Sequence, residues 1–164
     1  MKMLMFVAAL LPAAALADGS LLGTWKLQSY VREVLPSGER SNTFGDRPDA
    51  YLTYTADGRM HAILIMDNRA APHELVPSDA ERAKLQSTMV AYAGTYTLES
   101  DKVIHHVDIS WNQSWTGTDQ VRFYKLEGDR LTITTAPARS PLDGKEGRSI
   151  LVWKKVKPTS NAAR

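Results

Sequence analysis

The sequence has no cysteine, and this absence alone excludes several classes of site. A chain without cysteine has no disulfide framework, no thiol nucleophile and no zinc–thiolate centre. It also offers no cysteine to which a lipid could be attached after the apolar run near the N-terminus. Packing and hydrogen bonds must therefore hold the folded domain together without covalent cross-links.

An excess of either charge is also missing. The 20 basic and 18 acidic residues give a formal net charge of +2 and are interspersed along the chain. Such a balance gives no electrostatic reason to expect nucleic acid as a partner. Neither a Gly-x-Ser-x-Gly motif nor a phosphate-binding glycine loop occurs, so serine hydrolysis and nucleotide chemistry lose their usual support.

The histidines do not have the local spacing of a metal site. No pair follows the His-x-x-x-His pattern, which places two metal ligands on one face of a helix. Side chains from separate strands can still converge on a metal, and the sequence does not exclude that arrangement. We expect neither a metal nor another cofactor. The four histidines are His61, His73, His105 and His106.

The N-terminal segment reads as a targeting sequence. An apolar run at residues 3–11 follows Lys2, and small residues then lead to Ala17. This order of charge, apolar run and small residues is typical of a secretory signal peptide. A transmembrane anchor is the weaker alternative, because the run is shorter than the ~20 residues that a bilayer requires. We expect cleavage after Ala17 and a periplasmic or secreted protein with no stable membrane insertion.

The remainder of the chain is rich in short segments with β-strand character. Apolar, aromatic and β-branched residues recur in near-alternating order, and turn residues separate the segments. The turn Asp57-Gly58 between two such segments is a strong hairpin signal. The predicted strands lie at residues 24–34, 50–55, 59–66, 95–99, 102–110, 119–126, 130–135 and 149–156.

One helix is predicted between the third and fourth strands. Ser78 and Glu81 have the Ser-x-x-Glu spacing of a capping box. Apolar residues follow at roughly helical spacing, and Gly94 is expected to end the helix after about four turns. The apolar residues are Ala83, Leu85, Met89, Val90 and Ala93.

These elements favour a single all-β domain over residues 18–157. Consecutive hairpins with short connections favour an up-and-down antiparallel sheet. Eight strands are enough to close a barrel around one small ligand, and closure removes exposed strand edges. The sequence therefore predicts an eight-stranded antiparallel barrel with one inserted helix, followed by a disordered tail at 158–164.

Several short motifs carry a family resemblance. Gly23-Thr24-Trp25, at the start of the first strand, resembles the Gly-x-Trp signature of lipocalins. More specifically, six segments resemble the bacterial and fungal lipocalin-like domain family, in the same order and across nearly the whole chain after residue 18. They are LGTWKL (22–27), YLTYTADGRM (51–60), YAGTY (92–96), VIHHV (103–107), WTGTDQVR (115–122) and GDRLT (128–132).

The resemblance implies a calycin-type barrel with an internal cavity, in which Gly23 and Trp25 form a structural signature and Trp25 plugs the closed end. It implies little about activity, because the lipocalin fold hosts carriers, inhibitors and a few enzymes. The chain departs from its relatives in two respects. It lacks the disulfide that secreted lipocalins usually carry, and it has a signal sequence where comparable family members are often cytoplasmic.

Two adjacent histidines are the most informative polar residues. Neighbours on a strand point to opposite faces, so His105 and His106 cannot both enter the barrel. His105 shares its face with apolar residues, namely Val103, Val107 and Ile109. We therefore expect His105 to point inward. There it is either a hydrogen-bonded core histidine or a group that orients a ligand oxygen or acts as a general acid or base.

Arg122 and Tyr124 form the second candidate pair. They share a face because they are two residues apart. A guanidinium and a phenol inside a barrel would bind a carboxylate, and the pair resembles the Arg-x-Tyr pair of fatty-acid-binding calycins. Val121 and Phe123 compete for the interior, however. If they face inward, Arg122 is a solvated surface residue.

Aromatic side chains supply the remaining candidates, since aromatic bodies with polar tips suit flat or amphipathic ligands. Trp111 and Trp115 lie where a barrel mouth is expected. Tyr92 and the apolar residues Met60, Leu64 and Met66 either line a cavity or belong to the core. The assigned ligand-binding residues are His105, Arg122, Tyr124, Tyr54, Tyr96 and Trp115, and no residue is assigned a catalytic role.

Three functions fit this prediction. The first is a binding protein that holds a small hydrophobic or amphipathic molecule in the barrel. The second is a cofactor-independent isomerase or cyclase that moves protons in the same cavity. The third is an interaction or inhibitor module whose barrel is filled by its own side chains. Turnover separates the first two, and a cavity too small for a ligand would favour the third.

Overall fold

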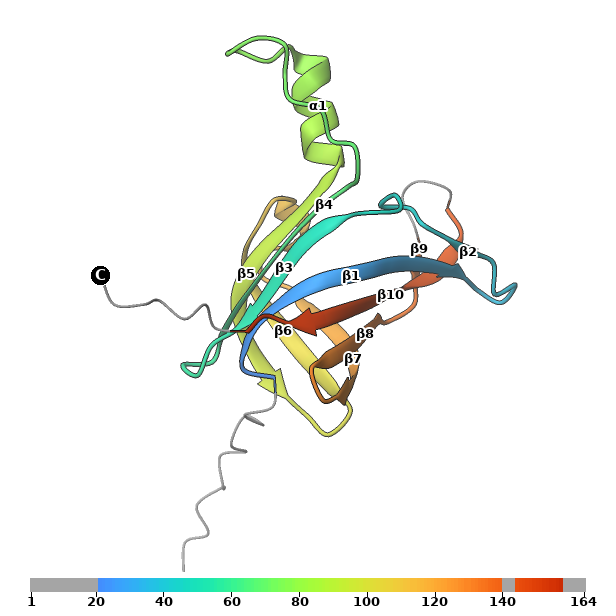
Figure 1. The fold of residues 1–164 in the computed structure, drawn as a ribbon, viewed down its shortest axis with the longest axis vertical. Helices are drawn as coiled ribbons and strands as arrows, with labels where there is room; N and C mark the ends of the chain where they lie inside the picture. The colour runs from blue at the N-terminus through green and yellow to red at the C-terminus, as the bar shows by residue number, and fades with distance from the viewer. Residues whose placement is uncertain (1–20, 140–143, 158–164) are drawn as a thin grey trace, which may run out of the picture.

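The computed structural model describes residues 21–139 and 144–157 (Figure 1). The predicted signal peptide at 1–17 and the predicted tail at 158–164 lie outside the described residues. Within the described part, the strands are β1 (Gly23–Val34), β2 (Arg40–Ser41), β3 (Asp49–Tyr54), β4 (Arg59–Ile65), β5 (Met89–Leu98), β6 (Lys102–Ser110), β7 (Asp119–Glu127), β8 (Arg130–Thr135), β9 (Ala138–Arg139) and β10 (Glu146–Lys155). The helices are α1 (Asp79–Ser87) and the short 3₁₀ helix η1 (Gln113–Trp115).

The long strands form a closed antiparallel barrel. Each long strand pairs with the next long strand along the chain, and β1 also pairs with β10, which joins the two ends of the sheet. The two-residue strands β2 and β9 extend β1 and β10. The fold class is therefore confirmed as an eight-stranded antiparallel barrel. The helix follows the third of the eight long strands, between β4 and β5 in the labels of Figure 1.

The barrel has two different ends. At one end, which we call the closed end, short turns connect β3 to β4, β5 to β6 and β7 to β8. Trp25, Leu131 and Trp153 are almost fully buried near it. At the other end, which we call the mouth, the connections at 35–48, 66–88 and 111–118 are longer. The rim at the mouth therefore carries more surface loop than the closed end does.

The helix is shorter than the sequence indicates. The capping box is present: the Ser78 hydroxyl accepts a hydrogen bond from the Glu81 N–H, and the Glu81 carboxylate accepts one from the Ser78 N–H. The helix ends at Ser87, however, and no residue in it is buried. It projects from the mouth as an arm (Figure 1).

The prediction that the helix continues to Gly94 is wrong. Residues 89–94 belong to β5, where they pair with β4 on one side and β6 on the other. Their apolar spacing fits either a helix or a strand, and hydrogen bonds to two neighbouring strands decide between them. This correction places Tyr92 and Tyr96 on one face of a strand, with Gly94 between them.

A β-bulge in β6 explains a second correction. Gly94 pairs with Val107 but Ala93 pairs with Ile109, so Asp108 is an extra residue. Beyond Asp108 the alternation reverses, and Ile109 is 67% exposed although we expected it to share the face of His105. Gly94 permits the close approach, because a Cβ there would lie 1.8 Å from the His106 carbonyl oxygen.

A buried acidic residue fastens the mouth end of β1. Glu33 is 6% exposed, and its carboxylate accepts hydrogen bonds from Arg40 (2.9 Å) and Arg148 (2.6 and 2.9 Å). The hydrogen bonds from Arg40 and then Arg148 hold the pKa of Glu33 below its ordinary value. These bonds tie β1 to β2 and β10 where the barrel closes.

Candidate functional site

The inner face of β6 carries a histidine in an otherwise apolar row. Val103, His105 and Val107 are 0%, 1% and 3% exposed, so His105 lies inside the barrel. The sequence-based prediction of its orientation agrees with this placement. A polar ring at such a position must find hydrogen-bond partners within the interior.

Two tyrosines supply those partners from opposite sides of the ring. The Tyr54 hydroxyl lies 2.8 Å from Nε2 of His105, and the Tyr92 hydroxyl lies 3.0 Å from Nδ1. All three residues are buried. The result is a hydrogen-bonded chain, Tyr54–His105–Tyr92, that joins β3, β6 and β5 across the interior.

Burial fixes the charge state of this chain. Burial lowers the pKa of the His105 ring well below its ordinary value, and the nearby positive charge of Arg122 lowers it further. Burial likewise raises the pKa of the Tyr54 hydroxyl well above its ordinary value. His105 and Tyr54 are therefore both neutral at physiological pH.

Arg122 also faces the interior. It is 9% exposed, whereas Phe123 beside it on β7 is 42% exposed, so the competition between the two faces is resolved in favour of Arg122. Its guanidinium donates hydrogen bonds to the Val121 carbonyl (3.0 Å) and to the Gln120 side chain (3.4 Å). It also lies 5.9 Å from the ring of Trp115.

The two remaining assigned tyrosines lie nearer the closed end. Tyr96 is 9% exposed, its hydroxyl donates to the Thr55 carbonyl (3.1 Å), and its ring packs edge-on against Tyr54. Tyr124 is partly buried against the core, and its hydroxyl donates to the Glu99 carbonyl (3.4 Å). Both contribute ring surface inside the barrel, but their hydroxyls bond to turns at its end.

Trp115 marks the mouth side of the site. It ends η1, and the Asn112 side chain caps that helix by accepting from the Ser114 N–H. The Trp115 ring packs edge-on against Tyr92 (centroids 5.5 Å apart) and against Trp111 (5.0 Å). An aromatic wall therefore runs from the mouth loop to the buried Tyr54–His105–Tyr92 chain.

The residues of the structural signature lie at the closed end. Trp25 is fully buried and its indole N–H donates to the Leu21 carbonyl (2.9 Å). Gly23 has a φ of 111° at the start of β1. Trp153 also belongs to the core cluster, but among the described residues its indole nitrogen is a buried donor with no hydrogen-bond partner.

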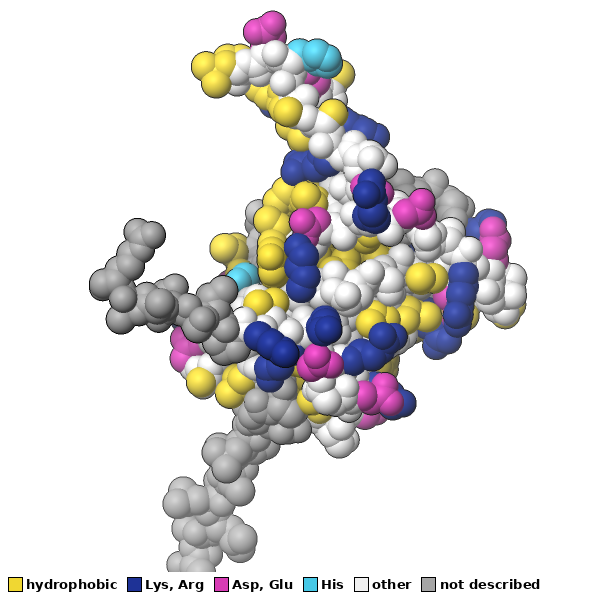
Figure 2. Space-filling view, viewed as in Figure 1, with side chains coloured by type: hydrophobic (Ala, Val, Ile, Leu, Met, Phe, Trp, Pro, Cys, Tyr) yellow, Lys and Arg dark blue, Asp and Glu magenta, His cyan; other side chains and the backbone are white. Residues whose placement is uncertain are grey.

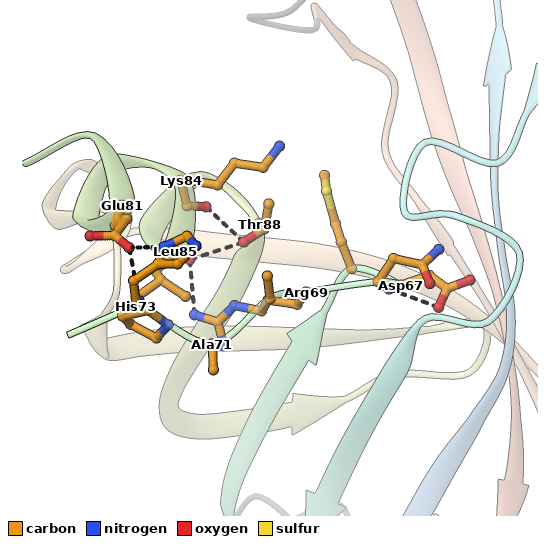
Figure 3. A pocket seen from close by; sticks show the side chains of 12 residues that line it. Asp67, Arg69, Ala71, His73, Glu81, Lys84, Leu85 and Thr88 are labelled. Atoms are coloured by element: carbon orange, nitrogen blue, oxygen red, sulfur yellow. Dashed lines mark hydrogen bonds and ion pairs between the residues drawn. The ribbon is translucent and has the colours of Figure 1, made fainter. Parts of the chain in front are cut away.

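A pocket of about 370 Å³ lies outside the barrel, at the base of the arm. Residues 66–73 line one side and α1 lines the other (Figure 3). The polar groups that Figure 3 labels there are largely engaged with the chain itself: Glu81 bonds to His73, and Arg69 donates to the Leu85 carbonyl. We did not expect this pocket from the sequence, and it is separate from the barrel residues described above.

Two kinds of feature are absent from the described part of the chain. No group of three or more histidine, cysteine or acidic side chains there is arranged to hold a metal ion. No helix there has the length and apolar character needed to cross a membrane.

Comparison with known proteins identifies the barrel. A model of the lipocalin-like domain family matches residues 22–156. The chain belongs to this family. It is also similar to the 4'-hydroxy-3'-methoxypropiophenone carrier protein of Aspergillus oryzae, with 34% identity over 89 residues that cover 48% of this chain and 78% of the relative.

Two interior residues of this lipocalin-like barrel, Tyr92 and Trp153, were not among the ligand-binding residues assigned from the sequence. Tyr92 was named as a residue of the cavity wall or the core but was not assigned to the ligand site, because the predicted helix hid its period-two relation to Tyr96. A strand beginning at Met89 would have revealed that relation. Trp153 lies on a predicted strand, but nothing in the sequence signals that its N–H lacks an internal partner.

Proposed function

We propose that this lipocalin-like protein is exported and carries a small hydrophobic or amphipathic molecule in its barrel. The ligand would enter at the mouth, pass Trp115 and lie against the aromatic wall. Burial of its apolar surface would supply the driving force, at roughly 25 cal/mol per Å² before the costs of association. The contacting residues would be His105, Arg122, Tyr124, Tyr54, Tyr96 and Trp115.

The observation that carries this proposal is a buried hydrogen-bond donor in the core that has no acceptor in the described part of the chain. A buried donor without a partner costs about 1–3 kcal/mol, so native cores seldom keep one without a reason. The indole N–H of Trp153 is such a donor among the described residues. An acceptor atom on a ligand inside the barrel would satisfy it.

The similar carrier protein suggests which class of ligand the barrel would hold. The name of the Aspergillus oryzae relative describes a carrier of an aromatic ketone that also bears a hydroxyl and a methoxy group. A molecule of this class has a flat apolar ring with polar atoms at its two ends. The barrel offers Tyr92 and Trp115 to the ring and hydroxyl or N–H groups to the oxygens.

Native mass spectrometry of the full chain, purified gently from its source, tests the carrier proposal. We expect a discrete additional mass that organic solvent releases unchanged. A protein that shows only the mass of its chain, and that also fails to bind 4'-hydroxy-3'-methoxypropiophenone and a fatty acid when these are added, would contradict the proposal.

A pair of variants locates the ligand. Trp115→Leu removes the aromatic wall at the mouth, and binding followed by tryptophan fluorescence or calorimetry should weaken about 5- to 10-fold. Phe123→Leu is the matched control, because Phe123 is 42% exposed on the outer face of β7. Equal affinities for the two variants would place the ligand outside the barrel.

The Tyr54–His105–Tyr92 chain also favours a second candidate, a cofactor-independent isomerase or cyclase. A neutral imidazole between two phenols can pass a proton from one side to the other. The carrier remains the better proposal, because both ring nitrogens of His105 are already bonded to tyrosines. Recovery of the bound molecule in a different isomeric form after incubation would favour the enzyme.

Export is a separate part of the proposal, supported by the order of residues 1–17. The intact mass of the protein, measured separately in cytoplasmic and exported fractions, tests it. We expect an exported form that begins at Asp18. A full-length chain confined to the cytoplasm would contradict export without affecting the carrier proposal.

A further inference from the structure

The guanidinium of Arg122 is a buried cation without an acidic partner. The residue is 9% exposed, and its two hydrogen bonds go to a carbonyl and an amide of its own strand. No carboxylate among the described residues forms an ion pair with it. Burying a charge is costly unless an opposite charge or a full set of hydrogen bonds compensates it.

Two titratable groups near Arg122, His105 and Tyr54, are neutral. Arg122 is close enough to lower the pKa of His105 by its charge, and it acts on Tyr54 in the same way. Its remaining neighbour of note is the Trp115 ring, which attracts a cation through its π face. Glu33 of the same barrel shows the contrast, since two arginines compensate that buried charge.

The position of Arg122 on β7 also matters. It is the fourth residue of the strand, which begins at the mouth with Asp119. A ligand that enters past Trp115 therefore meets Arg122 before it reaches the closed end. A guanidinium has five N–H donors, and the two hydrogen bonds to Val121 and Gln120 leave others for a ligand.

We infer that the barrel takes a ligand with an anionic oxygen, a phenolate or a carboxylate, and that Arg122 is its counterion. The inference rests on the proposed carrier function and makes it more specific. The ring of the ligand lies against Trp115, which packs on Tyr92, while its charged oxygen pairs with the guanidinium. A phenol would lose its proton to the buffer on binding, and the electron pair of the broken O–H bond would stay on the oxygen.

Three matched probes test this inference with the full chain. They are 4-hydroxypropiophenone, its methyl ether 4-methoxypropiophenone, and 4-propionylbenzoate. At a pH where the free phenol is mostly protonated, we expect the bound phenol to show the long-wavelength absorption of a phenolate. Calorimetry in buffers of different ionisation enthalpy should then register the released proton. The methyl ether, which cannot ionise, should bind about 10- to 100-fold more weakly.

The carboxylate probe distinguishes the two sources of an anionic oxygen. Tight binding of 4-propionylbenzoate with weak binding of the phenol assigns a carboxylate ligand. The reverse order, together with weaker binding of the methyl ether than of the phenol, assigns a phenolate. Both results support the pairing with Arg122. Equal affinity for the phenol and its methyl ether, with weaker binding of the carboxylate, would overturn it.

Arg122→Met removes the charge and keeps most of the side-chain volume. We expect this variant to bind the ionised probes about 10- to 100-fold more weakly and to bind the methyl ether as well as before. Lys125→Met is the control, because it removes one positive charge from the exposed side of the same strand. Equal effects of the two variants would overturn the inference.

The probe series keeps the inference testable if Arg122→Met fails to fold, because the comparison of phenol, ether and carboxylate uses the unmodified chain. It also separates two kinds of failure. Binding of the methyl ether alone overturns the anionic ligand but retains the carrier. Binding of none of the three probes, with no ligand in native mass spectrometry, overturns the carrier proposal and the inference together.

Discussion

His105 and His106 are neighbours in the sequence, yet they lie in two different chemical environments. His105 is 1% exposed and hydrogen-bonded to two buried tyrosines. His106 points outward, where its nitrogens lie 2.8 Å from the Thr97 hydroxyl and 2.7 Å from the Asp119 carboxylate. Both rings are fully partnered, so hydrogen bonding alone does not distinguish them. The difference is solvent, which can replace lost partners only on the outer face.

The outer face of the barrel is mixed rather than strictly polar. Figure 2 shows basic and acidic side chains alternating with apolar ones over the strands, and the arm carries apolar groups at its tip. Tyr51 and Ile63, paired between β3 and β4, are each 44% exposed. Apolar residues on the surface are common in folded proteins. The inner and outer faces of the barrel therefore differ in how deeply their side chains are buried, and less in which residue types they carry.

The largest expected difference between the faces comes from introducing a charge. Val103→Asp places an unpaired carboxylate at a position that is 0% exposed, and we expect it to cost several kcal/mol, enough to prevent folding of a typical domain. Ile104→Asp, one residue further on the outer face, should cost only about 1 kcal/mol. Soluble yield and thermal unfolding monitored by circular dichroism would measure both. Equal losses would show that the two faces are not distinct.

A smaller effect is expected at the bulge that changes which residues of β6 face inward. Gly94→Ala brings a methyl group against the His106 carbonyl, and we expect a loss of about 3 kcal/mol, more than backbone strain alone would cost. Gly117→Ala is the control: its φ of 77° also disfavours a side chain, but no atom lies within 4 Å of the added Cβ. Its cost should be about 1–2 kcal/mol, from backbone strain alone. Denaturant unfolding would detect the difference, and an equally stable pair would refute the close approach.

Removing each histidine ring compares the faces directly. His105→Phe leaves the Tyr54 and Tyr92 hydroxyls without a common partner and should cost about 1–3 kcal/mol. The triple variant with Tyr54→Phe and Tyr92→Phe should recover part of that loss, because no buried hydroxyl then lacks a partner. His106→Gln should change stability by less than about 1 kcal/mol. A larger loss for His106→Gln than for His105→Phe would reverse our interpretation.

The smallest effect is a dependence of stability on pH. The pKa of His105 is below its ordinary value of 6.5 in the folded protein, so as the pH falls through 6.5 the unfolded state binds a proton first. Stability contributed by neutral His105 is therefore fully present above 6.5 and declines below it, by at most about 1.4 kcal/mol per pH unit. Denaturant unfolding between pH 7 and 5 should show this slope, and His105→Phe should remove it.

The buried carboxylate of Glu33 does not contribute to the slope in this window. The arginine-bonded carboxylate of Glu33 has a lowered pKa, so its contribution is lost only as the pH falls below its ordinary value of 4.5. His106→Gln is the matched control for the slope, since it should leave the contribution of His105 intact. If the slope disappeared with His106→Gln and persisted with His105→Phe, it would not come from His105, and the prediction would be contradicted.

Much of the barrel could be predicted because local signals and long-range pairing agree. The turn at Gly58, the alternation of β6 before its bulge and the pair Gly23 and Trp25 all point to the observed fold. Residues 89–94 could not be assigned in the same way. Their apolar pattern fits a helix or a strand, and only pairing with β4 and β6 resolves the ambiguity.

The interior polar residues show a similar limit. Period-two alternation placed His105 inside and put Arg122 and Tyr124 on one face, but it could not choose between that face and the face of Phe123. The hydrogen-bond partners of His105 come from β3 and β5, which are distant in sequence. An extra residue such as Asp108 also changes the face of everything after it. Such a bulge has no sequence signature beyond the glycine that permits it.

The hydrogen-bonded chain through His105 has a direction. A neutral imidazole carries one N–H, so it donates to one tyrosine and accepts from the other. If Nδ1 carries the hydrogen, Tyr54 donates to the ring and Tyr92 retains its own hydroxyl hydrogen for a neighbour. The other tautomer reverses both roles. An acceptor brought to Tyr92 from the mouth would therefore select one tautomer, and its arrival would be registered at Tyr54 on the far side of the ring.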